Sequence, residues 1–250
     1  MNELNILYLY PDILELYGDF GNIQVLKYRL EKRGIKANVT PYSIGNDAPN
    51  FSDYDLVFAG GGADQEQGIL SKDLVNYKAN IKEAIKSGVF FLLICGAYQL
   101  FGKYYKDAEG DIIPGLGIFD YYTEALNDRK KRCIGNIVLN CNLNGKETKV
   151  IGFENHGGQT FDIKTPFGDV LYGNGNKFGD DKEGFFLKNV IATYLHGPLL
   201  SKNPDVSDYI IKYCLDRKYN EDIVLEPLDD TLENLCRKQL LGRFLKSENN

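Results

Sequence analysis

One cysteine and one histidine, far apart in the sequence, each follow a short apolar run. Cys95 follows residues 89–94, V-F-F-L-L-I, and His196 follows V-I-A-T-Y-L. A thiol within hydrogen-bond reach of an imidazole can attack an acyl carbon as a thiolate, after which the histidine protonates the leaving amine. The pair therefore predicts nucleophilic acyl chemistry. The alternatives are a buried structural cysteine and a histidine satisfied in a turn.

A second histidine, His156, lies in F-E-N-H-G-G-Q-T and is the competing candidate for the general base. We expect it to bind or orient a group rather than to take the proton.

Small residues flank the candidate nucleophile and also follow an earlier apolar run, F-A-G-G-G at residues 58–62. Glycine allows a backbone N–H to approach a reacting oxygen closely, so Gly61 and Gly62 together with Gly96 are candidates for an oxyanion hole. A phosphate-binding loop is the alternative. The pattern G-x-x-x-x-G-K-[ST] is absent and no lysine follows the glycines, which argues against an ATP site.

The elements that must position these residues alternate between strands and helices. We predict strands at residues 5–10, 35–40, 55–59 and 89–94, a helix that starts at Asp19 or Asn22 and ends at Gly34, and a helix at residues 72–87. This order predicts an α/β fold with an open, mostly parallel sheet flanked by helices. Cys95 then lies on a strand-turn-helix elbow, and the glycines and Cys95 meet at the carboxyl ends of the strands.

The second half has shorter strands, which we predict at residues 115–119, 134–139, 150–153 and 190–194. Helices are expected at residues 204–217 and 230–246, the second with Leu232, Leu235, Cys236 and Leu240 facing inward. No linker or repeat is visible in the sequence, so we expect residues 1–250 to form a single domain that includes both helices.

Composition excludes several classes of protein. The formal net charge is −6, which argues against nucleic-acid binding, and no apolar run approaches the ~20 residues that span a bilayer. Five cysteines without a C-x-x-C pair, beside only two histidines, indicate neither a disulfide framework nor a zinc site, and we expect no metal. We expect a cytoplasmic protein with reduced thiols.

Several ordered motifs together resemble a known family. I-C-G-A-Y-Q, F-A-G-G-G, G-F-E-N-H-G-G and A-T-Y-L-H-G-P-L-L are similar to class I glutamine amidotransferases of the CobB/CobQ (cobyric-acid synthase) type, although Ala192 stands where that pattern often has glycine. Y-G-D-F-G-N-I-Q-V-L, G-G-G-A-D-Q-E-Q and G-L-G-I-F-D-Y-Y-T-E extend the resemblance to the GatD family across nearly the whole chain. The resemblance implies a flavodoxin-like fold. It also implies a glutaminase subunit in a heterodimer with MurT, an ATP-dependent ligase, which together amidate the D-glutamate of lipid II to D-isoglutamine.

The resemblance also implies roles for single residues. Cys95 would form a γ-glutamyl thioester, His196 would be the general acid and base, and Gln99 would line the substrate site. An arginine would clamp the α-carboxylate of L-glutamine. Counting back from Gly135 selects Arg132, which we prefer, and counting forward from Thr123 selects Arg129. No cofactor is expected in this chain, and ATP and magnesium are expected in the partner ligase.

The third member of a catalytic triad is the point where the sequence departs from the pattern. Many class I amidotransferases have a glutamate two residues after the histidine, and Pro198 occupies that position here. Glu154 is one candidate, but the resemblance implies a dyad whose acid comes from the partner ligase. The isolated chain would then hydrolyse glutamine slowly. Two alternatives remain open: an amidotransferase subunit for cobyric-acid-type amide synthesis, and a non-catalytic binding module of the same fold. The resemblance also implies a location at the inner membrane face through lipid II.

Overall fold

The protein is organised around a six-stranded sheet, sheet A, in the order β13-β14-β4-β3-β1-β2. The computed structural model describes residues 2–245 and, for Asp64, Gln65 and Arg129, the backbone alone. All strand pairs of sheet A are parallel except β13 with β14. The strands are β1 (Glu3–Leu9), β2 (Lys36–Tyr42), β3 (Leu56–Ala59), β4 (Phe90–Ile94), β13 (Phe185–Leu187) and β14 (Val190–Thr193). The predicted open, mostly parallel sheet is confirmed.

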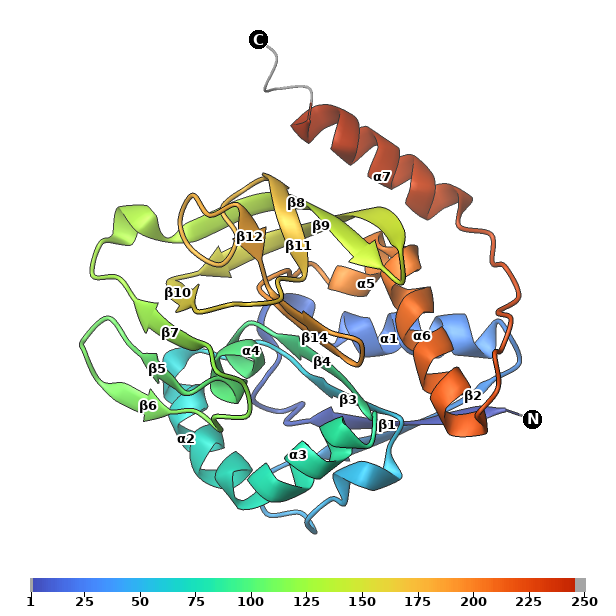
Figure 1. Ribbon diagram of the computed structural model, residues 1–250, viewed down its shortest axis with the longest axis horizontal. Helices are drawn as coiled ribbons and strands as arrows, with labels where there is room; N and C mark the ends of the chain where they lie inside the picture. The colour runs from blue at the N-terminus through green and yellow to red at the C-terminus, as the bar shows by residue number, and fades with distance from the viewer. Residues whose placement is uncertain (1, 246–250) are drawn as a thin grey trace.

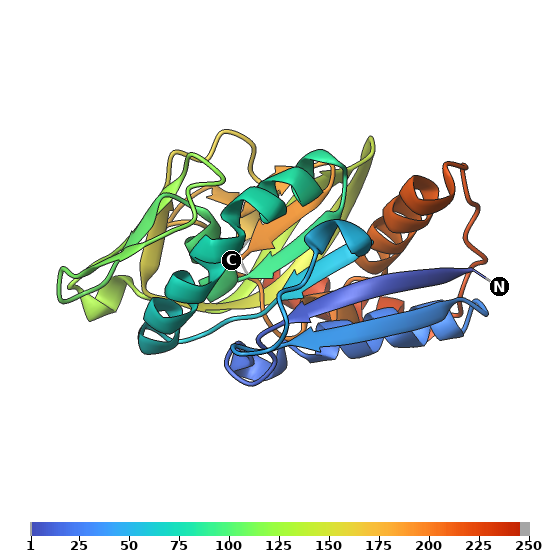
Figure 2. The same cartoon turned by 90° about the horizontal axis from the view of Figure 1, so that it is seen from below.

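Helices cover both faces of sheet A. Figure 1 shows α1 and α6 on one face and α2 and α3 on the other, and Figure 2 gives the same arrangement from below. The connection from β1 to β2 and the connection from β3 to β4 run in opposite directions along the sheet. Because connections between parallel strands are right-handed, their helices lie on opposite faces. The helices are α1 (Gly21–Glu31), α2 (Asp64–Leu74), α3 (Lys78–Lys86), α4 (Gly96–Phe101), α5 (Leu199–Lys202), α6 (Pro204–Tyr219) and α7 (Thr231–Phe244).

Two four-stranded sheets extend the molecule beyond the carboxyl end of β4 (Figure 1). One has the order β10-β7-β5-β6 and the other β12-β11-β8-β9. Their strands are β5 (Tyr104–Lys106), β6 (Ile112–Pro114), β7 (Tyr122–Ala125), β8 (Cys133–Leu143), β9 (Lys146–His156), β10 (Gly158–Phe161), β11 (Gly168–Tyr172) and β12 (Lys182–Glu183). The long hairpin of β8 and β9 contains the strands predicted at residues 134–139 and 150–153.

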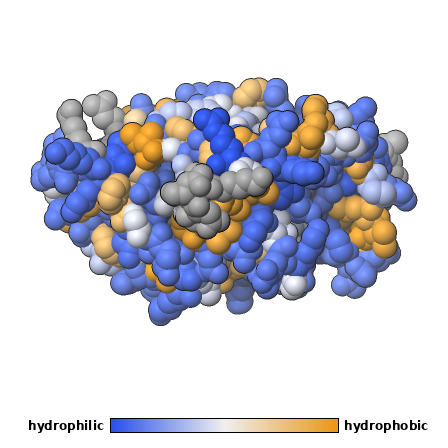
Figure 3. All heavy atoms as spheres, turned by 90° about the horizontal axis from the view of Figure 1, so that it is seen from above, coloured by the Kyte–Doolittle hydropathy of each residue, from blue (hydrophilic) through white to orange (hydrophobic). Residues whose placement is uncertain are grey.

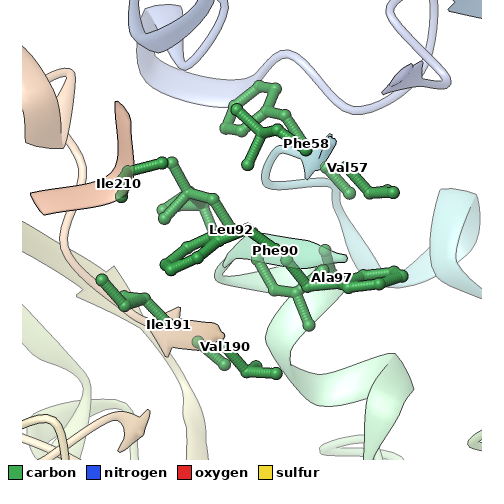
Figure 4. Packing of buried hydrophobic residues seen from close by; sticks show 14 of the residues in the cluster. Val57, Phe58, Phe90, Leu92, Ala97, Val190, Ile191 and Ile210 are labelled. Carbon is green, nitrogen blue, oxygen red and sulfur yellow. The ribbon is translucent and has the colours of Figure 1, made fainter. Parts of the chain in front are cut away.

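The core forms around β4, whose five side chains are all buried. Figure 4 shows Phe90 and Leu92 between Phe58 of β3, Ile191 of β14 and Ile210 of α6. A continuous apolar strand of this kind requires cover on both faces, which the helices supply. The burial of β4 therefore fixes the position of Cys95, which directly follows this strand.

Two predicted elements differ in the structure. The helix predicted at residues 72–87 is two helices, α2 and α3, separated by the 3-10 turn Val75–Tyr77. That turn directs the Tyr77 hydroxyl to the Tyr42 hydroxyl of β2, 2.8 Å away. Residues 115–119 form no strand, because the N–H groups of residues 116–119 donate to carbonyls at the end of α4 and just beyond it.

The C-terminal helix was predicted only in part. α7 covers most of residues 230–246, of which residue 246 lies outside the described residues. Leu232, Leu235 and Cys236 are exposed rather than inward, whereas Leu240 packs beside Phe244, whose ring stacks on Tyr172 of β11. The apolar contact of α7 with the sheet β12-β11-β8-β9 is thus near its C-terminal end, and Arg237 in its middle donates to the carbonyl of Lys149 in β9.

The face of the molecule seen from above in Figure 3 is mostly polar. Figure 3 shows hydrophobic side chains in separate patches among hydrophilic ones on the face that it presents. Within residues 2–245, no helix combines the length and the apolar character needed to cross a bilayer.

Candidate active site

Four loops meet at the carboxyl edge of sheet A and carry the predicted chemistry. β4 ends at Ile94 and leads to Cys95, β3 ends at Ala59 and leads to the glycines, and β14 ends at Thr193 and leads to His196. The loop after β1, which the sequence analysis did not include, lies beside them through Asp19. Parallel strands bring their carboxyl ends to one edge, so residues distant in sequence become neighbours there.

Cys95 occupies a strained turn between β4 and α4. Its backbone has φ 52° and ψ −102°, a conformation that is rare for residues other than glycine, and its N–H donates to the carbonyl of Thr193 at 2.8 Å. The side chain is 6% exposed. Backbone strain at a buried polar turn is typical of functional positions. The predicted elbow is therefore present, with the thiol at the start of a helix.

His196 is held by an acid of this same chain. Its Nδ1 lies 3.0 and 3.1 Å from the two carboxylate oxygens of Asp19, and both side chains are fully buried. The expectation that the chain lacks the third acid is therefore wrong. Asp19 was read as a candidate helix cap, and its position in Y-G-D-F-G-N was the available signal. The carboxyl group fixes the imidazole with Nδ1–H toward Asp19, which leaves Nε2 for the thiol.

Charge at this site favours a protonated His196. Burial lowers the pKa of His196, but the neighbouring Cys95 sulfur and then Asp19 raise it, and the net result is a pKa of about 10. His196 Nε2 has no hydrogen-bond partner among residues 2–245. The arrangement thus stabilises an imidazolium next to the cysteine, as the thiolate–imidazolium interpretation requires.

The oxyanion hole predicted from the glycines needs one correction. The N–H of Gly61 donates to Asp19 Oδ2 at 2.9 Å, so it does not point at a substrate oxygen. The N–H groups of Gly62 and Gly96 have no acceptor among the described residues. A β-carbon on Gly96 would lie 2.9 Å from Gly62 N, so these two N–H groups are close together. The candidate hole is Gly62 with Gly96, and Gly61 instead holds the acid.

A cavity of about 520 Å³ opens beside Cys95 and has room for an amino acid. Gln99 lines it, but both ends of the Gln99 amide are engaged: Oε1 accepts from Gln67 at 2.7 Å and Nε2 donates to the Tyr194 hydroxyl at 3.2 Å. Gln99 therefore forms a fixed part of the cavity wall.

Of the two candidate arginines, Arg132 is the one that the structure places at the cavity. Its Nε donates to Asn155 Oδ1 at 3.0 Å, and a β-carbon on Gly157 would lie 3.2 Å from its Nη1. Arg129 begins the 3-10 turn Arg129–Lys131, and its side chain lies outside the described part of the structure. The guanidinium of Arg132 is exposed at the cavity mouth, where a carboxylate could reach it.

His156 also lines the cavity, as a neutral imidazole. Burial lowers its pKa to about 3, and its Nδ1 lies 2.7 Å from the carbonyl oxygen of Gly158, to which it donates. The ring stacks on Tyr194 with centroids 3.6 Å apart. A histidine that stays uncharged at neutral pH fits the predicted role in binding or orienting a group, and that role stays a prediction.

Cys133, Glu154 and His156 are the described residues that come nearest to a metal-binding group, with ligand atoms within 4.8 Å of one another. The oxygens of Glu154 already accept three hydrogen bonds from Asn174 and Gly175. Burial, followed by Glu154, raises the pKa of the Cys133 thiol to about 12. Both Glu154 oxygens are thus engaged by neighbouring N–H groups, and the acid that bonds to His196 is Asp19 rather than Glu154.

Comparisons with known proteins agree with this geometry. Residues 5–204 match the model of the CobB/CobQ-like glutamine amidotransferase domain. The chain is 40% identical to the lipid II isoglutaminyl synthase (glutamine-hydrolyzing) subunit GatD of Staphylococcus aureus, over 97% of each chain. It is 42% identical to the subunit of the same name from Streptococcus pneumoniae, over 92% of this chain and 87% of that one. A solved structure of PurLQS from Thermotoga maritima has the same fold, with a TM-score of 0.54 at 14% identity, over 88% of this chain and 100% of that chain.

Proposed function

Because the chain belongs to the CobB/CobQ-like glutamine amidotransferases and, within them, to the GatD family, we propose that it hydrolyses L-glutamine and supplies the ammonia to a ligase subunit. The observation that carries this proposal is the buried series Cys95, His196 and Asp19 at one edge of sheet A. A strained elbow presents the thiol, and the acid holds the imidazole toward it. A non-catalytic binding module would not need a cysteine, a histidine and an aspartate in this arrangement, so the arrangement favours an enzyme.

The reaction follows from these positions. The Cys95 sulfur attacks the side-chain amide carbon of glutamine. The amide oxygen becomes negative and accepts hydrogen bonds from the N–H groups of Gly62 and Gly96. His196 gives its proton to the leaving nitrogen, which departs as ammonia and leaves a γ-glutamyl thioester. Water, deprotonated by His196, then attacks the thioester and releases glutamate and the thiol. Asp19 keeps the imidazole in one orientation through both steps.

The cavity supports glutamine as the substrate. Arg132 would bind the α-carboxylate, and the buried side chains of Gln99 and His156 line the same cavity. A guanidinium forms two parallel hydrogen bonds with a carboxylate, which gives orientation as well as affinity. The reactive amide would then extend inward to Cys95.

For the acceptor, we propose the D-glutamate of lipid II, amidated to D-isoglutamine by a MurT-like ligase that binds ATP and magnesium. Both GatD relatives carry lipid II isoglutaminyl synthase in their names, and this chain aligns with them over nearly their whole length. The complex would work in the cytoplasm at the membrane face that holds lipid II, as part of peptidoglycan biosynthesis. Ammonia made beside the ligase is used before it is lost to solvent.

The test is transfer of a labelled nitrogen. The complex of this chain with a co-expressed MurT-like ligase is given ATP, magnesium, lipid II and glutamine labelled with nitrogen-15 in its side-chain amide. We expect the label in the D-isoglutamine of the product by mass spectrometry, and none with Cys95→Ser. Glutamine hydrolysis without labelled lipid II would instead point to another acceptor, such as a cobyric-acid-type substrate.

A further inference from the structure

Two buried acceptor atoms in the cavity wall have no donor. Oε2 of Glu66 and Oε1 of Gln67, adjacent residues of α2, are without a hydrogen-bond partner among the described residues, and both side chains line the cavity that holds Cys95. Buried acceptors left without a donor cost free energy, so they indicate a site that is completed by a ligand. The missing ligand must bring N–H or O–H groups.

The orientation of the Gln67 side chain is fixed by its own nitrogen. Nε2 donates to Gln99 Oε1 at 2.7 Å and lies 3.5 Å from the carbonyl oxygen of Gly62. Both neighbours are acceptors, so the amide cannot be turned around without placing oxygen against oxygen. Oε1 is therefore the open end of Gln67, which is only 2% exposed.

Glu66 stands close to the reacting centre. A β-carbon on Gly62 would lie 3.7 Å from Glu66 Cβ, and Gly62 is the glycine that faces Gly96 next to Cys95. The other acid that lines the cavity, Asp128, is exposed and accepts from the N–H of Lys130 at 3.0 Å. Glu66 is thus the lining carboxylate that lacks a partner on its buried oxygen.

The chemistry of the occupant follows from the charges. A carboxylate and an amide oxygen of residues that line one cavity suit a positively charged donor with several N–H groups, and the one permanent cation among the cavity-lining residues is Arg132. A free amino acid carries both complementary groups. We propose that Glu66 and Gln67 form the subsite for the α-ammonium group of the substrate glutamine, with Arg132 holding its α-carboxylate; the inference rests on the proposed function.

The experiment compares two substrates that differ only in that group. Glutaramate, the half-amide of glutaric acid, has the amide and the carboxylate of glutamine but no α-amino group. Glu66→Gln removes the negative charge with little change in shape. In the complex with the ligase, we expect Glu66→Gln to lower kcat/KM for glutamine by about 10- to 100-fold and to change that for glutaramate by less than about twofold. Glu83→Gln, on the exposed face of α3, is the matched control and should change neither.

Covalent labelling separates the possible failures. 6-Diazo-5-oxo-L-norleucine carries the α-ammonium and should label Cys95 more slowly in Glu66→Gln, while iodoacetamide should label wild type and variant at equal rates. Equal losses for glutamine and glutaramate would overturn the inference, because Glu66 would then serve the amide or the released ammonia. An unchanged glutamine rate in Glu66→Gln would overturn it too. Wild type that hydrolyses neither substrate and resists the diazo reagent would contradict the proposed function itself.

Discussion

Asp19 links the two halves of the candidate catalytic machinery. One carboxyl group accepts from His196 Nδ1 and from the N–H of Gly61, so it sets the imidazole orientation and the path of the glycine loop together. The chain consequently holds a complete cysteine–histidine–aspartate series. An acid supplied by the partner ligase is therefore not needed to orient His196, and that hypothesis stays a prediction.

Asp19→Asn tests this arrangement. The amide can present an N–H to His196 Nδ1, which favours the wrong tautomer, so we expect kcat for glutamine hydrolysis to fall by about 10²- to 10⁴-fold. Steady-state glutamate release measures it. Asp12→Asn, an exposed acid of the same loop, is the control and should retain activity. A variant at Asp19 with near-normal kcat would mean that the carboxyl group only supports the loop.

The two histidines should titrate at opposite ends of the pH scale. His196 has a pKa raised to about 10. Its protonation therefore stabilises the folded state fully below pH 6.5, and this stabilisation is lost as pH rises from 6.5 through 10. His156 has a pKa lowered to about 3, so it lowers stability as pH falls from 6.5 toward 3. NMR of the ring carbons measures both, since the chain has only two histidines.

Cys95→Ala gives a check on the cause. Among the influences that raise the pKa of His196, the Cys95 sulfur is the largest, so its removal should shift the alkaline titration toward neutral pH. The titration of His156 should stay where it is. A His196 titration near 6.5 in the wild type would contradict the thiolate–imidazolium pair.

Sequence reasoning found Cys95 and His196 because each follows a buried apolar strand, which is a local and readable pattern. It missed Asp19, which lies 177 residues from His196. The two meet because β1 and β14, although β3 and β4 separate them in sheet A, end at the same edge of the sheet. It also assigned Gly61 to the oxyanion hole, because a run of glycines does not reveal which N–H is already bound. The Asp19 carboxylate takes the N–H of Gly61, which leaves the N–H of Gly62 for the oxyanion hole.

At the scale of elements, β9 holds the histidine loop in place. Phe153 and His196 form an antiparallel bridge, with N–H to carbonyl distances of 2.9 and 3.1 Å. Gly152 of β9 lies directly against Leu195, the residue before His196, since a β-carbon on Gly152 would be 2.6 Å from Leu195 Cβ. The sheet that contains β9 therefore sets the position of His196, which follows β14 of sheet A.

Gly152→Ala should disturb catalysis from outside the cavity. The added methyl group must displace Leu195, and we expect a loss of about 1–3 kcal/mol in the free energy of unfolding. The shift reaches the adjacent His196, so kcat/KM should fall by about 10-fold or more. Chemical denaturation and glutamate release measure the two effects. Gly242→Ala in α7, where nothing lies within 4 Å of the new carbon, should show neither; an active Gly152→Ala would separate β9 from the site.

The parallel strands of sheet A were predictable because short apolar runs next to glycines mark them, whereas the antiparallel edge strand β13 was not predicted. Residues 115–119 were not, because their N–H groups bond to the end of α4 and no strand pattern could reveal this. α7 looked amphipathic by spacing, yet Leu232, Leu235 and Cys236 in its first half face solvent. Helical periodicity alone does not say whether a covering surface exists.

At the scale of the whole molecule, the C-terminal arm is tied to the sheet A helices by charge. The buried Arg29 of α1 bonds to Asp208 of α6 and to Asp230, which precedes α7. A buried guanidinium with two carboxylates is a specific clamp. The expectation of a single domain that includes the C-terminal helices stays a prediction, which this clamp and the stacking of Phe244 on Tyr172 support.

The measurement that tests the central claim most directly is glutamate release from glutamine by the wild-type chain and by Cys95→Ser, each with and without the MurT-like ligase. We predict release by the wild type in the complex and a loss of at least about 10³-fold with Cys95→Ser, because no other group can form the thioester. Equal release by the two proteins would contradict a cysteine amidotransferase.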